Sequence, residues 1–188
     1  MEKDFSEKVL QDLSPYFNIE TQVRGTHFSS TKLIVDAVLT PKDKSKWKDE
    51  NVCFGIEFKC ESKLESVKDN ILWINQCIDY ADTNWNKYGY IHIFSCPGIF
   101  DKLKRSLKDL PLWNRLISNM GVGTLENHPR YGWTFYLQDS HRIWSQKDGV
   151  ISGKHWSLKR KFGRRGFSFF EKDLNRQDVL KCVKRNIY

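Results

Sequence analysis

Three ionisable residues lie in apolar segments of this 188-residue sequence, where charged side chains are not expected. Asp36 falls inside the run LIVDAVL, and Glu57 and Lys59 fall inside VCFGIEFKCE. Burying a charge costs several kcal/mol unless a metal ion or an opposite charge compensates it. We therefore expect these three side chains to have a partner, and that partner determines the chemistry available to them.

The patterns around the three residues indicate how they can meet. Both runs predict β-strands, and residues two apart on a strand point to the same face, so Glu57 and Lys59 project together. The lysine-rich connection PKDKSKWKDEN predicts a hairpin loop, which can bring Asp36 beside Glu57. Two carboxylates suit Mg²⁺ or Mn²⁺, and a lysine can orient an attacking water, as phosphodiester hydrolysis requires. A buried salt bridge between Asp36 and Lys59, with Glu57 at the sheet margin, is the alternative.

This arrangement resembles the PD-(D/E)XK nucleases, the superfamily with the restriction-endonuclease-like fold. In that family an acid on one strand and a (D/E)-x-K triplet on the next form the metal site. Asp36 and Glu57-Phe58-Lys59 match these positions, with 20 residues between the two acids, and Val35 replaces the proline of the family name. The resemblance, over roughly residues 5–138, implies that Asp36, Glu57 and the Phe58 carbonyl bind Mg²⁺ or Mn²⁺ and that Lys59 positions water.

Gln76 and Tyr80 match a second motif of the same superfamily. They form the Q-x-x-x-Y pattern of its RecB-like and lambda-exonuclease-like branches, on a predicted helix that directly follows the EFK strand. Residues four apart share one helix face, so both side chains can reach one DNA strand. An ordinary amphipathic helix explains the same two residues, and Leu33 replaces the glycine that RecB-like enzymes often carry three residues before the strand acid.

Two further residues near the beginning of the chain are candidates. Glu7 lies in a helix predicted over residues 4–14, where many such nucleases supply one more metal-directed carboxylate; a surface glutamate is the alternative. Arg24 and His27 lie in RGTHFSST, a predicted turn, from which either can touch a phosphate.

The net charge of +8 comes from one end of the chain. Residues 1–150 contain 20 Lys and Arg against 20 Asp and Glu, whereas residues 151–188 contain 11 against 3. There the segment GKHWSLKRKFGRRGFSFF interleaves cations, which neutralise phosphates, with aromatic rings, which stack on bases. A basic strand pair with its aromatic residues in the core is the alternative. The nucleic-acid-binding residues expected here are Lys154, Lys159, Arg160, Lys161, Arg164 and Arg165.

The order of the predicted elements indicates an α/β fold. After the helix over 4–14 come the strands FNIETQV, LIVDAVL (buried on both faces) and VCFGIEFKCE, a helix from Leu64 to about Trp85, the strand YGYIHIFSC, helices over 97–110 and 112–120, the strand GVGTL, and an antiparallel hairpin of WTFYLQ and HRIWSQ. With the resemblance, we expect a restriction-endonuclease-like core over residues 1–150, with a mixed central sheet flanked by helices. A basic C-terminal extension over 151–188 is expected to pack on it as one structural unit.

Composition excludes several other classes of protein. Hydrophobic residues make up 39% and aromatic residues 14% of the chain, as in a packed globular protein rather than a disordered one. The five cysteines form no C-x-x-C pair, so neither a disulfide framework nor a zinc site is indicated. No apolar run approaches the ~20 residues of a membrane span, so we expect a cytoplasmic protein with no membrane partner.

The function expected from these observations is that of a Mg²⁺-dependent deoxyribonuclease. We expect an endonuclease rather than an exonuclease and DNA rather than RNA as the substrate. Cutting both strands calls for two active sites, which a homodimer would provide. The alternative is a catalytically silent nucleic-acid-binding subunit of the same fold.

Overall fold

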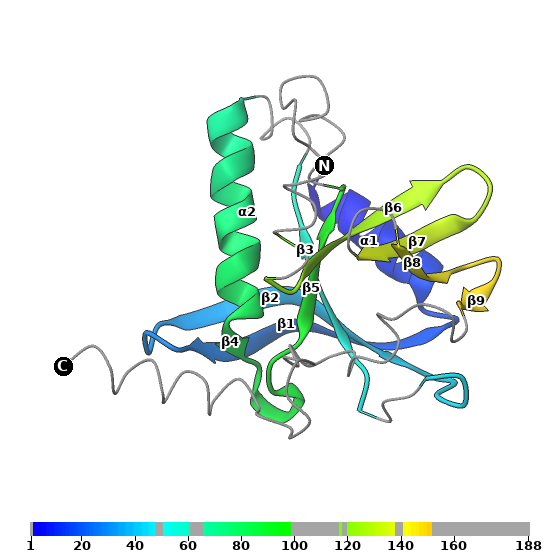
Figure 1. Ribbon diagram of the computed structural model, residues 1–188, viewed down its shortest axis with the longest axis horizontal. Helices are drawn as coiled ribbons and strands as arrows, with labels where there is room; N and C mark the ends of the chain where they lie inside the picture. The colour runs from blue at the N-terminus through cyan, green and yellow to red at the C-terminus, as the bar shows by residue number, and fades with distance from the viewer. Residues whose placement is uncertain are drawn as a thin grey trace.

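The protein folds around one curled, mixed β-sheet with a helix on each face (Figure 1). The computed structural model describes residues 2–47, 51–60, 66–98, 117, 120–137 and 141–151. In these ranges the elements are α1 (Glu2–Leu13), β1 (Phe17–His27), β2 (Lys32–Pro41), β3 (Phe54–Phe58), α2 (Val67–Ala81), β4 (Thr83–Asn84), the short 3₁₀ helix η2 (Asn86–Tyr88), β5 (His92–Cys96), β6 (Val122–His128), β7 (Gly132–Leu137), β8 (His141–Ser145) and β9 (Gly149–Val150).

The nine described strands lie in the order β4-β1-β2-β3-β5-β6-β7-β8-β9. Strands β1, β2 and β3 pair antiparallel, β3, β5 and β6 pair parallel, and β6 to β9 pair antiparallel again. The parallel step from β3 to β5 requires a crossover, and α2 lies in that connection. The predicted α/β class, a sheet that begins antiparallel and then gains crossover strands, is therefore confirmed.

Two apolar cores, one on each face of the sheet, hold the helices in place. Val9 and Leu13 of α1 pack in one core, and Trp73 and Cys77 of α2 pack in the other. Side chains alternate between faces along a strand, so Phe54, Ile56 and Phe58 of β3 join the α1 core. That alternation leaves Glu57, between Ile56 and Phe58, on the α2 side of the sheet.

Helix α2 is shorter than the sequence pattern predicts. It begins after Ser66, whose hydroxyl accepts the N–H of Asp69 at 3.1 Å, as an N-cap does. It ends at Ala81 because Thr83 and Asn84 pair with His27 and Thr26 of β1. The predicted end near Trp85 is therefore wrong, since the apolar periodicity continues into residues that belong to the sheet.

Strand β1 is longer than predicted, and β2 is less buried. The expected turn RGTHFSST is wrong over Arg24 to His27, which continue β1: Arg24 to Thr26 pair with β2, and His27 pairs with β4. The turn is confined to residues 28–30. In β2 only the residues from Ala37 to Leu39 are buried on both faces, whereas Ile34 is 43% exposed. The expectation that the whole run LIVDAVL is buried is corrected accordingly.

The β7–β8 hairpin is confirmed, with Leu137 paired to His141. The helices expected over 97–110 and 112–120 fall mostly outside the described residues, as does nearly all of the extension over 151–188. Within the described residues, no helix has the length and apolar character needed to cross a membrane.

Candidate active site

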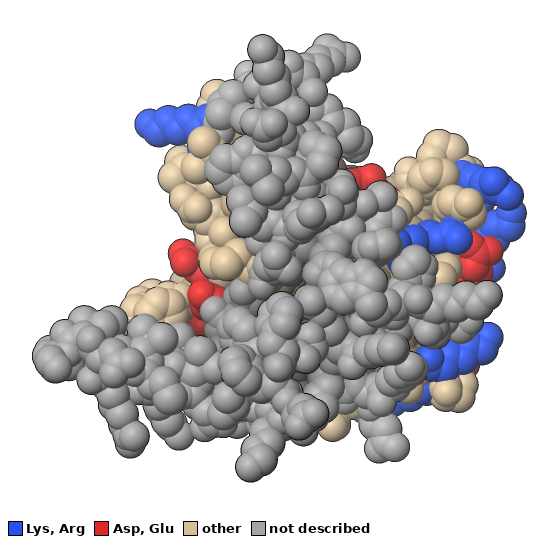
Figure 2. Space-filling model, in the orientation of Figure 1, with Lys and Arg blue, Asp and Glu red and all other residues tan. Residues whose placement is uncertain are grey.

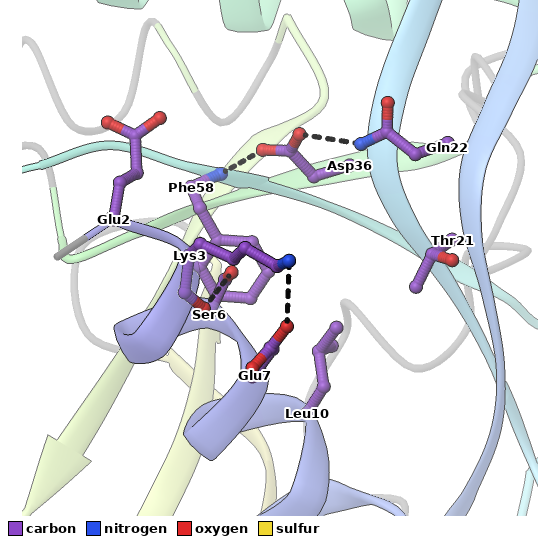
Figure 3. Close-up of a pocket in the computed structure, with 9 residues that line it drawn as sticks. All are labelled: Glu2, Lys3, Ser6, Glu7, Leu10, Thr21, Gln22, Asp36 and Phe58. Carbon is purple, nitrogen blue, oxygen red and sulfur yellow. Dashed lines mark hydrogen bonds and ion pairs between the residues drawn. The ribbon is translucent and has the colours of Figure 1, made fainter.

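Asp36 is held between the two strands that flank β2. Its Oδ2 atom accepts the backbone N–H of Phe58 at 2.8 Å, and its Oδ1 atom accepts the side-chain amide of Gln22 at 3.3 Å (Figure 3). The pairing of Ala37 with Ile56 brings the middle of β2 to the end of β3, where the Phe58 N–H lies. The hairpin therefore places Asp36 beside the Glu57-Phe58-Lys59 triplet, as the sequence predicts.

Glu57 is a buried acid with one carboxyl oxygen unsatisfied. Its side chain is only 5% exposed; Oε1 accepts the amide of Gln76 at 2.8 Å, and in the ionised form Oε2 is buried with no hydrogen-bond partner among the described residues. Burial raises the pKa of Glu57 to about 9, and the negative charge of Asp36 and a hydrogen bond between the two carboxyl groups, formed when Glu57 is protonated, add to the shift. A buried, unsatisfied oxygen next to a second carboxylate is a position that a cation would stabilise.

Lys59 follows the last residue of β3 and is half-buried. Its backbone N–H donates to the Cys96 carbonyl at 3.0 Å, which extends the pairing of β3 with β5 by one residue. Its positive charge acts on Glu57 and lowers the pKa of that carboxyl, against the larger effect of burial. In the described part of the chain Asp36 and Lys59 form no ion pair, so the salt-bridge alternative does not describe this arrangement.

Gln76 and Tyr80 lie on one face of α2, and Gln76 meets Glu57. The Gln76 amide donates both to Glu57 and, at 3.0 Å, to the Tyr80 hydroxyl. Tyr80 is 8% exposed and packs edge-on against Trp85, and burial followed by the charge of Glu57 raises its pKa to about 12. Gln76 therefore holds Glu57 from the helix side, and Tyr80 is bonded to Gln76. The i, i+4 spacing predicts that Gln76 and Tyr80 lie together but not the contact with Glu57.

Helix α1 closes the other side of the site. A cavity of about 450 Å³ lies between its first turns and strands β1 and β2, lined by Glu2, Lys3, Ser6, Glu7, Leu10, Thr21, Gln22, Asp36 and Phe58 (Figure 3). The predicted residue Glu7 lines this cavity, but its side chain is 65% exposed and lies 3.8 Å from the Lys3 ammonium. Glu2, which the sequence does not single out, accepts the Cys60 N–H at 2.8 Å and so ties α1 to the residue after Lys59.

Arg24 is not brought to this centre. Arg24 is exposed on β1, paired opposite Ile34, and not in a turn. The cations Lys154, Lys159, Arg160, Lys161, Arg164 and Arg165 lie outside the described residues. Gln22, which touches Asp36, was missed because nothing in the local pattern of β1 distinguishes it from its exposed neighbours.

The donor set fits a hard divalent cation bound through few protein ligands. The described residues contain no group of three or more His, Cys, Asp or Glu side chains able to hold a metal. Two carboxylates with waters are nevertheless an accepted donor set for Mg²⁺, which keeps much of its hydration shell. The unsatisfied Oε2 atom of Glu57 is the observation that favours such an ion.

No protein-family model matches the sequence, and no curated protein or solved structure is significantly similar to the chain.

Without divalent metal, the free energy of unfolding should fall as pH rises from about 5 to about 9. Glu57 has a pKa of about 9 in the folded chain against an ordinary value of 4.5, so in this window the folded state holds a proton that the unfolded state has released. The slope should approach ~1.4 kcal/mol per pH unit. Denaturant unfolding in EDTA at several pH values measures it.

The Glu57→Gln variant should show a flatter pH profile, because glutamine cannot ionise. Glu7→Gln is the matched control, since it makes the same chemical change at a largely exposed side chain and should keep the wild-type slope. Equal slopes for wild type and Glu57→Gln would contradict the burial of an ionisable Glu57.

Proposed function

We propose that this chain is a metal-dependent nuclease of the PD-(D/E)XK type that hydrolyses phosphodiester bonds in DNA. The observation that carries the proposal is the meeting of Asp36 with Glu57, whose buried Oε2 atom has no partner among the described residues. In the metal-free chain a proton on Glu57, shared with Asp36, can satisfy that oxygen, and an ionised Glu57 would need a cation there instead. The intact D…E-x-K set, with the lysine charge acting on Glu57, supports catalysis rather than binding alone.

Each residue of the set has a distinct role in this proposal. Asp36 and Glu57 would hold Mg²⁺ or Mn²⁺, and the Phe58 carbonyl would add a ligand; the ion would supply charge stabilisation for the phosphoryl oxygens. Lys59 would orient the attacking water: its ammonium form donates a hydrogen bond to the water, and its neutral amine form would accept the water's proton. Gln76 keeps Glu57 in place through the hydrogen bond to Oε1.

The order of elements around the site supports the assignment of a restriction-endonuclease-like fold. A leading helix, an antiparallel β1-β2-β3 unit that carries the acids, a helix after the triplet and a parallel β5 are the features that a restriction-endonuclease-like core implies. We propose that fold for the core over residues 1–150, with the extension over 151–188 as its basic addition.

Nucleic acid as the partner is supported by the distribution of positive charge. The net charge of +8 comes from the 11 cations against 3 acids of residues 151–188. Among the described residues, Lys and Arg side chains also gather on the side of the molecule formed by β7 to β9 (Figure 2). There Arg130 and Lys147 are exposed, whereas Arg142 is neutralised by Asp148 at 2.7 Å. A homodimer would provide the two active sites that double-strand cleavage needs.

Nicking of a supercoiled plasmid tests the proposal directly. The purified chain should convert the plasmid to the open circular form with Mg²⁺ or Mn²⁺ and leave it intact in EDTA. An Asp36→Asn preparation, purified in parallel, controls for a contaminating nuclease. Plasmid binding without cleavage in either metal would instead identify a silent nucleic-acid-binding subunit, and the absence of both would overturn the proposal.

A further inference from the structure

Gln22 adopts a backbone conformation that glutamine normally avoids. Its φ angle is 54°, in the left-handed region that costs energy for residues with a side chain. The other two described non-glycine residues with positive φ, Ser30 and Asn86, lie outside the strands, in a turn and in a 3₁₀ helix. The strained backbone of Gln22 therefore lies in the interior of a paired strand, where residues normally adopt an extended conformation.

The strained residue lies directly opposite the proposed metal ligand. Thr21 pairs with Ala37 and Val23 pairs with Val35, so the register places Gln22 opposite Asp36 with no residue inserted. Side chains of opposite residues in an antiparallel pair project on the same side and lie close together. The backbone conformation of Gln22 therefore determines where its side-chain amide lies relative to the Asp36 carboxylate.

Two hydrogen bonds hold the Asp36 carboxylate beside Gln22. Nε2 of Gln22 donates to Oδ1 of Asp36 at 3.3 Å, and the Phe58 N–H donates to Oδ2 at 2.8 Å. The two donors approach the carboxylate from opposite sides, one from β1 and one from β3 (Figure 3). Each oxygen is thus held by one uncharged donor, which fixes the plane of the carboxylate while leaving its charge available to a cation.

The face that β1 presents to the cores changes near Gln22. Ile19 packs against the α1 core, whereas Val23, four residues further on, packs in the α2 core, so the alternation of side chains is interrupted between them. The side chain of Gln22 itself is exposed, and residues in such sparsely populated backbone conformations cluster at functional sites. Gln22 also lines the cavity that contains Asp36.

We propose that Gln22 is a positioning residue of the metal site, which orients the Asp36 carboxylate for a divalent cation. The inference rests on the proposed function and adds to it a residue that does not touch the metal or the reacting atoms. Partners that hold a ligating carboxylate typically contribute 10–100-fold to metal affinity, about the effect expected here.

Two substitutions of Gln22 separate positioning from a structural role. Gln22→Met keeps the length of the side chain and the strained backbone but removes the donor. Gln22→Gly removes the donor and also relieves the strain, because glycine adopts positive φ freely. Asn18→Ala is the control, since Asn18 is an exposed amide residue of β1 paired with Thr40, away from the site.

Calorimetric titration of the full chain with Mn²⁺, without nucleic acid, is the main measurement, with thermal melting in EDTA as the second. Both Gln22 variants should bind Mn²⁺ about 10–100-fold more weakly than wild type. The Tm of Gln22→Gly in EDTA should equal or exceed the wild-type value. Weaker metal binding in a variant that is at least as stable supports positioning, because a structural role would lower both together.

Two other results would overturn the inference in distinguishable ways. Wild-type Mn²⁺ binding that is retained in both Gln22 variants but lost in Asp36→Asn would remove Gln22 from the site and leave the proposed function standing. A wild-type chain that binds no Mn²⁺ would overturn the proposed function and, with it, the role of Gln22.

Discussion

Asp36→Asn and Glu57→Gln should each abolish metal-dependent cleavage while leaving the chain folded. Each change removes one of the two carboxylates that would hold the ion and preserves the shape of the side chain. We expect a loss of about 10³-fold or more in turnover, since a bound metal contributes several kcal/mol of charge stabilisation and each 1.4 kcal/mol is tenfold. Plasmid nicking at saturating Mg²⁺ measures the loss.

The same substitutions should not lower thermal stability. Asp36 raises the pKa of Glu57, so the two acids repel each other when both are ionised. Neutralising either one relieves that repulsion, and the Tm in EDTA should rise or stay unchanged. Gln at position 57 can still accept from Gln76, as Glu57 does. Wild-type turnover in either folded variant would show that the metal-site assignment is wrong.

The meeting of Asp36 and Glu57 is predictable only in part. Alternation along β3 fixes the face of Glu57, and the hairpin between consecutive strands brings β2 beside it. Along β2 the alternation is interrupted at Asp36, because Val35 packs in the α2 core and Ala37 in the α1 core, and the sequence pattern does not predict this. The contact between Gln76 and Tyr80 depends on helical periodicity alone, so the sequence is sufficient to state it.

The contributions of Gln22 and Glu2 are not predictable in the same way. Gln22 meets Asp36 because of the register of β1 on β2, and no local signal announces its positive φ. Glu2 reaches the Cys60 N–H only because α1 packs across the sheet, 58 residues away in the chain. Both depend on tertiary packing, which the residue pattern around each position does not encode.

The extent of β1 shows the same dependence on distant partners. The residues from Arg24 to His27 have the composition of a turn, yet Arg24 to Thr26 pair with β2 on one side, and Thr26 and His27 pair with β4 on the other. Two neighbouring strands supply the hydrogen bonds that override local preference. The same pairing removes Thr83 and Asn84 from the predicted helix.

Lys59→Ala should remove turnover and spare binding. If Lys59 orients the attacking water, the variant should lose about 10²–10⁴-fold in single-turnover rate, the usual range for a positioned proton-transfer group. Metal binding should survive, because Asp36 and Glu57 remain. Mn²⁺ titration, DNA binding and single-turnover cleavage of one preparation measure the three properties separately.

The structure also predicts that Lys59→Ala stays folded. Removing one partner of a buried ion pair typically costs about 3–5 kcal/mol, which would unfold a marginally stable chain. Asp36, however, is held by the Phe58 N–H and the Gln22 amide, and among the described residues it makes no ion pair with Lys59. The Tm of the variant should therefore lie close to that of wild type.

Lys59→Arg separates the two ways in which the lysine can act. Arginine keeps the positive charge near Glu57 but does not release its proton at any accessible pH. If Lys59 only stabilises negative charge, Lys59→Arg should recover part of the rate that Lys59→Ala loses. If Lys59 exchanges a proton with water, Lys59→Arg should be as slow as Lys59→Ala. A folded Lys59→Ala variant with undiminished turnover would remove the lysine from the mechanism.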